Sequence, residues 1–237
     1  MKHPIALAGT AAILSLGLLF AATAQEEEPP TSPQEEIIEG IDVSHFQGTI
    51  DWKAVEGAGI RFTFIKATQG TRWVDPRFKA NWTEVAKTGI RRGAYHFLDP
   101  DVDGTQQARH FLDTVTLEDG DLLPVVDVET KGPDLVANLE KFLAEIRRQT
   151  KLEAMIYVSP AFWNEHLKDV RTEPWPNPLW IAEYGVSEPR AAIGLGPWQV
   201  WQYEEDGRVA GIEGPVDRDR ARSVRPAKAP IPQPTED

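Results

Sequence analysis

Residues 122–129 read LLPVVDVE, an apolar run that ends in two acidic residues. The β-branched residues predict a buried strand. Asp127 and Glu129 are two positions apart, so their side chains point to the same face, roughly 6–7 Å apart along the strand. Val126 and Val128 then point to the opposite face. The run therefore predicts a strand that packs on one side and presents two carboxylates on the other.

Similar runs, rich in β-branched and aromatic residues, lie before and after this one. We predict strands at residues 37–43, 61–66, 93–98, 122–128, 154–158, 179–183 and 199–203. Helical patterns fill several gaps, at residues 75–86, 106–115, 132–146 and 161–168. The first of these helices is predicted to have Asp75 as its N-cap and Pro76 at its first position.

Strand–helix units that repeat in this way predict an α/β fold with a parallel sheet, most simply a closed barrel. The alternation fails after Tyr184, where a strand rich in Trp and Tyr follows with turns and no clear helix. We therefore predict an irregular (β/α) barrel, TIM-like, with a regular first half and an incomplete second half. In such a barrel, catalytic groups lie on the loops at the carboxyl ends of the strands.

The composition limits the possible partners. The 237 residues include 25 Lys+Arg and 37 Asp+Glu, which gives a net charge of −12. This balance argues against nucleic acid or an anionic membrane surface as the main partner, because both need a basic footprint. The chain has no cysteine, so disulfides, thiol catalysis and Cys-ligated zinc are excluded.

Residues 1–24 have the pattern of a secretory signal peptide. A short basic start precedes an almost wholly apolar run, and Ala22-Thr23-Ala24 forms a small-x-small cleavage site before Gln25. A retained transmembrane anchor is the alternative, since the run approaches the length that spans a bilayer. We expect cleavage, no stable membrane anchor, and export to the periplasm or the extracellular space.

The rest of the chain divides by composition. Residues 25–36 are acidic and Pro-rich, which is typical of a solvated linker, with an acidic binding tail as the alternative. Residues 223–237 are again Pro-rich and without periodicity, and we predict a disordered tail there. Residues 37–222 form one predicted folded domain.

Acidic residues are predicted at two strand ends, with Asp42 after the first strand and the pair Asp127 and Glu129 after the fourth. Two neighbouring carboxylates raise each other's pKa, so that one can stay protonated near neutral pH. Carboxylate pairs that flank a glycosidic bond are the usual machinery of glycoside hydrolysis. On spacing alone, an ion pair between these carboxylates and a neighbour such as Lys66 is an equally good interpretation.

Aromatic residues concentrate in the last third of the chain, at Trp180, Tyr184, Trp198, Trp201 and Tyr203. Tyr95 lies on the predicted inward face of the third strand. On pattern alone, such residues more often form a core than a ligand site. Aromatic rings beside carboxylates at a barrel mouth nevertheless suit sugars, whose apolar faces stack on aromatic rings.

The histidines show no metal-ligand spacing, and we predict neither a metal nor a cofactor. His96 and His110 are interpreted as structural, and the role of His45 is left open. No Gly-x-Ser-x-Gly elbow and no Gly-rich phosphate loop is present in the sequence.

Several motifs occur in one order along the chain. They read IDVSHFQG at 41–48, IDW at 50–52, FIKAT at 64–68, GAYHF at 93–97, DVE at 127–129, LWIA at 179–182, WQY at 201–203 and GPVD at 214–217. Together they resemble the family 25 glycoside hydrolases, the Chalaropsis-type lysozymes. The resemblance runs from about residue 38 to residue 220.

The resemblance implies an irregular β/α barrel that cleaves the β-1,4 bond between N-acetylmuramic acid and N-acetylglucosamine. It places the general acid on Glu129, the carboxylate that assists the substrate's acetamido group on Asp127, and two further acids on Asp42 and Asp217. The expected partner is the peptidoglycan glycan strand, and we expect a monomer. The predicted substrate-binding residues are Tyr95, Lys66, Trp180, Tyr184 and Trp201.

Two departures from the family pattern stand out. Gln69 occupies a position where Glu is expected. The closing stretch reads VDRDR at 216–220 instead of continuing with apolar residues and Asn, which leaves the choice between Asp217 and Asp219 open.

Two other functions compete with this prediction. A chitinase-type barrel would carry a further acid two positions before Asp127, where this chain has Val125. A peptidoglycan-binding protein without catalysis would lack some of the acids, and all four are present.

Overall fold

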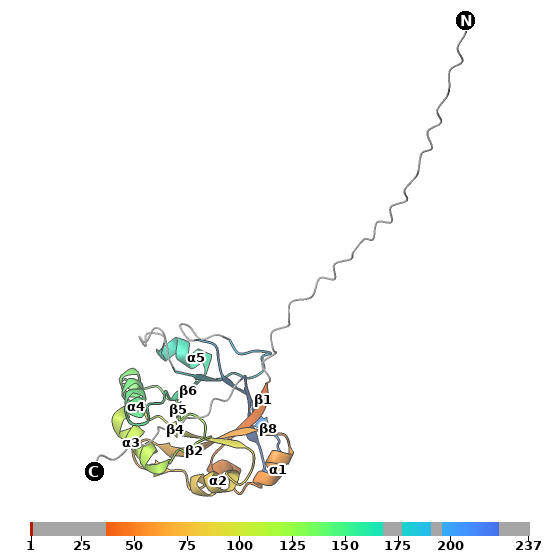
Figure 1. Ribbon diagram of the computed structural model, residues 1–237. Helices are drawn as coiled ribbons and strands as arrows, with labels where there is room; N and C mark the ends of the chain where they lie inside the picture. Colours follow the sequence, from red (N-terminus) through yellow and green to blue (C-terminus); the bar gives the residue numbers. More distant parts are fainter. Residues whose placement is uncertain (2–36, 168–176, 191–195, 223–237) are drawn as a thin grey trace. The chain divides into compact units, whose positions relative to one another are not determined.

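The computed structural model describes Met1 and residues 37–167, 177–190 and 196–222 (Figure 1). Apart from Met1, the predicted signal peptide, the linker and the C-terminal tail lie outside the described residues. None of the helices in the described part combines the length and the apolar character that crossing a membrane requires. The folded part is a closed barrel of strands with helices around it, which confirms the predicted α/β barrel.

Eight strands close the barrel in the order β1, β2, β4, β5, β6, β7, β8, β9 and back to β1. They are β1 (Ile38–Val43), β2 (Phe62–Gln69), β4 (Arg91–Phe97), β5 (Val125–Asp127), β6 (Met155–Val158), β7 (Leu179–Ala182), β8 (Val200–Gly207) and β9 (Val216–Ala221). Neighbours from β1 through β8 are parallel, whereas β9 is antiparallel to both β8 and β1. The short strand β3 (Trp73–Val74) pairs antiparallel with the end of β2.

Helices separate successive barrel strands from β1 to β7. They are α1 (Trp52–Gly57), α2 (Phe78–Val85), α3 (Gly104–Thr114), α4 (Leu135–Thr150) and α5 (Pro160–Phe162), which continues as a π-helical turn over Trp163–Leu167. Among the described residues after β7, no helix separates β7 from β8 or β8 from β9. The irregular second half is therefore confirmed.

Alternation along β5 decides which side chains face the barrel interior. Val126 and Val128 are fully buried in the outer apolar layer, between the strands and the helices. Val125 is fully buried on the inner side, in the cluster that contains Trp180. Burying one such side chain stabilises the fold by roughly 1.5–3 kcal/mol. Asp127 follows Val126 and returns to the inner side, as the sequence predicts.

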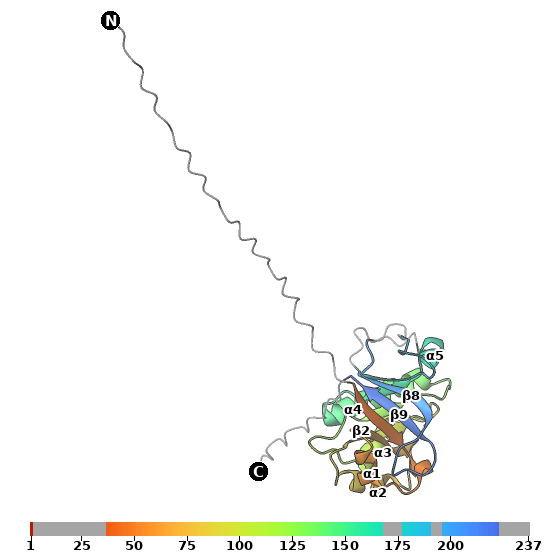
Figure 2. The ribbon, with the colours of Figure 1, turned by 90° about the vertical axis from the view of Figure 1, so that its right-hand side faces the viewer.

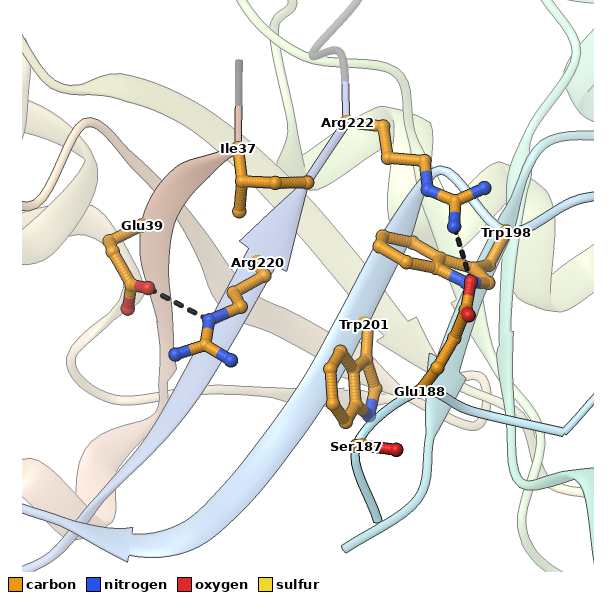
Figure 3. Close-up of a pocket in the computed structure, with 8 residues that line it drawn as sticks. All are labelled: Ile37, Glu39, Ser187, Glu188, Trp198, Trp201, Arg220 and Arg222. Carbon is orange, nitrogen blue, oxygen red and sulfur yellow. Dashed lines mark hydrogen bonds and ion pairs between the residues drawn. The ribbon is translucent and has the colours of Figure 1, made fainter. Parts of the chain in front are cut away.

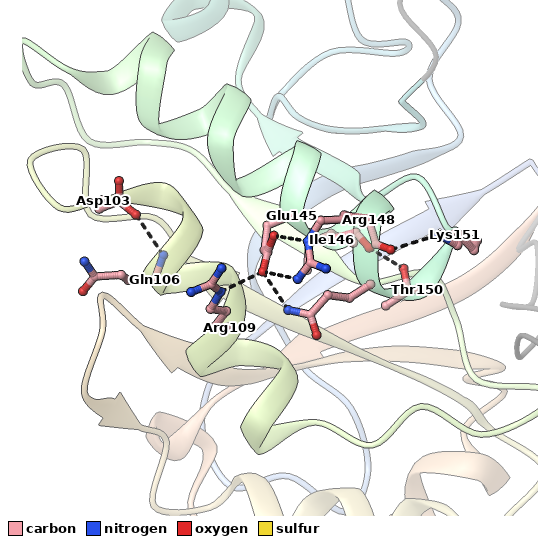
Figure 4. Close-up of polar contacts among 9 residues, drawn as sticks. Asp103, Gln106, Arg109, Glu145, Ile146, Arg148, Thr150 and Lys151 are labelled. Carbon is pink, nitrogen blue, oxygen red and sulfur yellow. Dashed lines mark hydrogen bonds and ion pairs between the residues drawn. The ribbon is translucent and has the colours of Figure 1, made fainter. Parts of the chain in front are cut away.

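Helices α3 and α4 are joined by the Glu145 carboxylate, which is only 6% exposed (Figure 4). It accepts hydrogen bonds from Arg109 of α3 at 2.8 Å and from Arg148 of its own helix at 2.7 Å. The Arg148 and Arg109 hydrogen bonds hold the pKa of Glu145 well below its usual range. The backbones of the two helices also approach so closely that a Cβ atom on Gly104 would lie 1.8 Å from the carbonyl oxygen of Asn138.

The predicted start of the helix at residues 75–86 is wrong. α2 begins at Phe78, and Asp75 does not cap it. The Asp75 carboxylate instead accepts from the backbone N–H of Arg77 at 2.8 Å and bonds the ring Nδ1 of His45 at 2.8 Å. This long-range contact outweighs the local capping pattern. α4 likewise begins at Leu135, after the predicted start.

Among the helices and strands named above, α1, β3 and β9 have no counterpart in the sequence prediction. The sequence of β9 reads VDRDRA, in which acids face the interior and arginines face outward. No apolar stripe marks it as a strand. The predicted helix at 161–168 is helical over its described part, and Lys168 lies outside the described residues.

Candidate active site

A small acidic cavity of about 100 Å³ opens where the parallel strands end. Its lining comes from β1, β4, β6, β7, β8 and β9 and from the end of β5, and consists of Asp42, Tyr95, Asp127, Glu129, Tyr157, Trp180, Gln202 and Asp217. A neighbouring cavity of about 270 Å³ shares the four acids and adds Lys66, Phe97 and Phe46. All four acids proposed from the sequence are thus brought together. We call these two cavities the acidic pocket.

Asp127 and Glu129 line both parts of the acidic pocket from the end of β5. Burial, and then the charge of Glu129, raise the pKa of Asp127 well above its usual range. Its Oδ1 atom is buried and has no hydrogen-bond partner. The charge of Glu129 thus acts on the neighbouring Asp127 carboxyl, as the spacing of the pair predicts.

Asp42 is held by a residue that the sequence prediction missed, Gln202 of β8. The Gln202 amide donates to Asp42 Oδ2 at 2.7 Å, and its Oε1 accepts from the hydroxyl of Tyr157 at 2.8 Å and from that of Tyr184. Burial, and then the nearby Asp217, raise the pKa of Asp42 well above its usual range. One amide therefore sets the positions of one acid and two phenols.

Asp217 and Asp219 occupy different environments. Asp217 pairs with Asp42 across β9 and β1 and lines the acidic pocket. Burial, and then the charges of Glu205 and Glu129, raise its pKa to about 6. Asp219 is fully buried below it and accepts from the indole N–H of Trp180 at 2.9 Å. The geometry favours Asp217 as the residue that can meet a ligand.

Three of the predicted substrate-binding residues, Tyr95, Trp180 and Lys66, line the acidic pocket. The ring of Tyr95 meets that of Trp180 edge-on at 6.3 Å. Lys66 Nζ lies 4.5 Å from the ring centre of Phe97, and no ion pair joins it to a carboxylate in the described part of the chain. The nearby Asp127 nevertheless opposes the effect of burial, which lowers the pKa of Lys66.

Tyr184 and Trp201 differ from that arrangement. Tyr184 is 40% exposed and reaches the pocket through its hydroxyl bond to Gln202. Trp201 lies outside the acidic pocket, on the opposite face of β8, because side chains alternate along a strand and Gln202 occupies the inner position. Trp201 is therefore not among the residues that line the acidic pocket.

Two histidines have structural contacts, as predicted. His96 is fully buried between Thr68 and Gln107, and burial lowers its pKa to about 3. His110 bonds the backbone oxygen of Trp73 at 3.0 Å.

The ring of His45, whose role the sequence leaves open, bonds the Asp75 carboxylate and lies beside the rings of Phe46 and Trp73. These two rings are 80% and 37% exposed, and they form an aromatic rim that the sequence prediction missed. Within the described ranges, no group of three or more His, Asp or Glu side chains is arranged to hold a metal.

Comparisons with known proteins agree with this geometry. The sequence model described as "Glycosyl hydrolases family 25" matches residues 41–212. Lysozyme M1 of Streptomyces globisporus is 37% identical over 197 residues, covering 77% of this chain and 67% of that protein. N,O-diacetylmuramidase of Chalaropsis sp. is 29% identical over 202 residues, covering 76% of this chain and 96% of that protein.

Solved structures give the same result. A bacterial lysozyme from Streptomyces coelicolor superposes with a TM-score of 0.72 at 35% identity, covering 79% of this chain and 93% of that chain. A family GH25 lysozyme from Aspergillus fumigatus superposes with a TM-score of 0.71 at 28% identity, covering 78% and 94%. The barrel and its acidic pocket thus occur in a chain whose sequence and structure both match one family. The chain belongs to glycosyl hydrolase family 25 and is a glycoside hydrolase.

Proposed function

We propose that the protein is a lysozyme-type hydrolase of peptidoglycan that cleaves the β-1,4 bond between N-acetylmuramic acid and N-acetylglucosamine. Glu129 is the general acid, and Asp127 assists the substrate's acetamido group. The observation that carries this proposal is the Asp127–Glu129 pair in the acidic pocket, with the buried Oδ1 of Asp127 lacking a partner. Relatives named lysozyme and N,O-diacetylmuramidase support the substrate class.

The raised pKa of Asp127 has a consequence for the resting enzyme. Burial and the charge of Glu129 raise the pKa of Asp127, which favours the protonated form of that carboxyl in the empty pocket. When the acetamido N–H of the substrate donates a hydrogen bond to Asp127, it favours the ionised carboxylate. The proton then moves to Glu129. Substrate binding thus places the proton on the residue that must deliver it.

The proposed reaction has two steps. Glu129 protonates the glycosidic oxygen while the acetamido carbonyl oxygen attacks C1, and the Asp127 carboxylate stabilises the positive charge that develops on the acetamido group. Water then opens the cyclic intermediate, with Glu129 as the base, and the anomeric configuration is retained. This route uses the substrate's own nucleophile in place of the enzyme carboxylate of the usual retaining scheme. Asp42 and Asp217 hold the pair and the substrate in place.

The test is the Glu129→Gln variant, which keeps the shape of the side chain and removes its proton. Turnover of purified cell wall should fall by roughly 10²–10⁴-fold, while wall binding is kept. Glu140→Gln, which alters an exposed carboxylate on α4, is the matched control and should keep full turnover. Near-native turnover by Glu129→Gln would overturn the assignment.

The products distinguish the remaining alternatives. Reducing-end analysis should find N-acetylmuramic acid at the new chain ends. Reducing N-acetylglucosamine would instead indicate a glucosaminidase-like or chitinase-like specificity. No released product from the unaltered protein would indicate a wall-binding protein without catalysis.

We further propose export, with a signal peptide at residues 1–24, a linker at 25–36 and a tail at 223–237. The support for these segments is the sequence pattern alone. N-terminal sequencing of material from outside the inner membrane should begin at or near Gln25. Retention of Met1 in that material would contradict the proposal.

A further inference from the structure

The outer face of β1, β9 and β8 holds a cavity that shares no lining residue with the acidic pocket. Figure 2 shows this part of the barrel, where no helix of the described residues lies over β8 and β9. The cavity measures about 530 Å³, within the roughly 300–1,000 Å³ typical of small-molecule sites. We call it the outer cavity, and its lining residues are Ile37, Glu39, Ser187, Glu188, Trp198, Trp201, Arg220 and Arg222 (Figure 3).

Aromatic rings and arginines alternate along this face. The guanidinium of Arg222 lies 4.0 Å from the ring centre of Trp198. That of Arg220 lies 4.1 Å from the ring centre of Tyr203 and 5.9 Å from that of Trp201. Stacking of this kind holds flexible side chains in one orientation, so the donors of the face are preorganised.

Each arginine is also paired with a glutamate. Glu39 accepts from Arg220 at 2.9 Å, and Glu188 accepts from Arg222 at 2.6 Å (Figure 3). These hydrogen bonds balance the local charges. A polyanion or a polycation would gain little here, because each charge that it could meet already has a counter-ion. An aliphatic ligand would leave the charged groups without partners.

Saccharides fit such a surface. Their apolar faces stack on indole rings, and their hydroxyl groups match both the carboxylate acceptors and the guanidinium donors. We propose that the outer cavity is a second saccharide-binding site, which holds a stretch of wall glycan away from the site of cleavage. This inference rests on the proposed function for its ligand, peptidoglycan glycan.

The two sites lie on opposite sides of the barrel wall. Gln202 points into the acidic pocket, and its neighbour Trp201 lines the outer cavity. A substitution in the outer cavity can therefore leave the catalytic acids untouched. Trp198 is the best residue for this purpose, because it is half-buried and lies just before β8, in the loop that leads into the strand.

The first experiment measures stoichiometry by native mass spectrometry. The probe is a tetrasaccharide of alternating N-acetylglucosamine and N-acetylmuramic acid, and the protein is the full mature chain with Glu129→Gln. Two tetrasaccharides should bind per chain. The double variant Glu129→Gln/Trp198→Ala should bind one. One ligand in both proteins, or two in both, would overturn the proposal.

The second experiment measures binding to insoluble wall and turnover of the soluble tetrasaccharide, with matched control variants. Trp198→Ala should reduce the fraction of protein bound to insoluble wall about 5–10-fold, while turnover of the soluble tetrasaccharide stays unchanged. Trp198→Phe should restore most of the wall binding. Arg147→Ala, which removes the α4 arginine from a pair with Glu153, is the matched control and should bind like the unaltered chain.

The outcomes separate this inference from the proposed function. Full turnover by Glu129→Gln would defeat the catalytic assignment, and the second site would then be tested by the wall binding of Trp198→Ala, which does not depend on the identity of the general acid. If Trp198→Ala does not fold, the number of tetrasaccharides bound by Glu129→Gln alone decides. Two per chain support a second site, and one per chain overturns it. Second-site binding that occurs only after deletion of residues 25–36 or 223–237 would assign the outer cavity to the chain's own terminal segment, and would overturn the proposal.

Discussion

Gln202 connects two groups of the acidic pocket through a single amide. Its N–H donates to Asp42, and its oxygen accepts from two tyrosines, so the amide can adopt only one orientation. Because both hydroxyl protons are used in this way, Tyr157 and Tyr184 present acceptor lone pairs to a ligand. Donors on the substrate, such as N–H and O–H groups, are the groups that these phenols can bind.

Gln202→Glu tests this arrangement through its pH dependence. The introduced carboxyl group, when ionised, cannot donate to Asp42 and repels it, whereas in its protonated form it can donate. The variant should therefore be less active than the unaltered enzyme near neutrality and should recover as the pH falls. The measurement is the pH profile of kcat/KM. An unchanged profile would show that Gln202 does not position Asp42.

Tyr95→Phe separates a ligand-binding hydroxyl from a structural one. No described residue forms a hydrogen bond with the Tyr95 hydroxyl, so its removal should lower turnover and leave the melting temperature nearly unchanged. Tyr203→Phe is the control, because that hydroxyl donates to Glu39 at 2.7 Å. It should cost about 0.5–1.5 kcal/mol of stability with little effect on turnover of soluble substrate. A large loss of stability in Tyr95→Phe would indicate a core role.

Side-chain alternation explains which site residues could be predicted from the sequence. The apolar pattern of β5 places Asp127 on the inner face, and the alternation of side chains along β4 places Tyr95 there. The pattern of β8 places Trp201 and Tyr203 on one face, but it does not show whether that face points inward or outward. Gln202 was missed because an amide carries no catalytic signal until the strands that bring it to Asp42 are paired.

At the scale of elements, long-range contacts explain the failures. Asp75 and Pro76 have the local pattern of a helix start, but the bond to His45 uses the carboxylate elsewhere. The sequence of β9 carries charges on both faces because its acids face the barrel interior and its arginines face outward, where Arg220 lines the outer cavity. Both features depend on residues that are distant in the sequence, so no local pattern could predict them.

The contact between α3 and α4 gives a test at this scale. Gly104→Ala would place a methyl group against the backbone of α4, and relief requires the helices to separate. We expect a loss of several kcal/mol, at the upper end of overpacking effects. Gly57→Ala is the control, since a Cβ atom there meets nothing within 4 Å and alanine favours a helix. Equal unfolding free energies in urea for the two variants would contradict this account.

At the scale of the whole molecule, buried carboxyls determine how stability depends on pH. The pKa of Asp217 is raised to about 6 in the folded protein, against about 3.9 in an unfolded chain. A raised pKa contributes stability at low pH that is lost as the pH rises through the folded value. Asp42, Asp127 and Asp219 act in the same direction. Glu145, whose pKa is lowered, acts in the opposite direction and loses its contribution only in acid.

The protein should therefore melt at a higher temperature at pH 5 than at pH 8. Asp217→Asn should reduce this difference, because it removes one of the groups that must ionise while buried. Glu145→Gln should lower the melting temperature at both pH values and leave the difference in place. Calorimetry at the two pH values measures all three effects, and equal melting temperatures in the unaltered protein would contradict the prediction.

Shortening the chain tests the predicted domain bounds. A chain of residues 37–222 should melt within a few degrees of the mature protein, because the Pro-rich segments outside it can bury little apolar surface. The same chain should retain turnover of soluble substrate. A collapse of its melting temperature would show that one of the removed segments packs on the barrel.

The barrel closes between its first and last strands, where Ile38 pairs with Ala221. The two ends of the domain are therefore immediate neighbours, and the order of elements around the barrel is cyclic. A short peptide joining residue 222 to residue 37 would need to span little distance, and new ends could open at the exposed turn of residues 118–120. Such a circular permutant keeps every strand pair, the acidic pocket and the outer cavity, and β9 and β1, which lie at opposite ends of the unaltered domain, become consecutive along the chain.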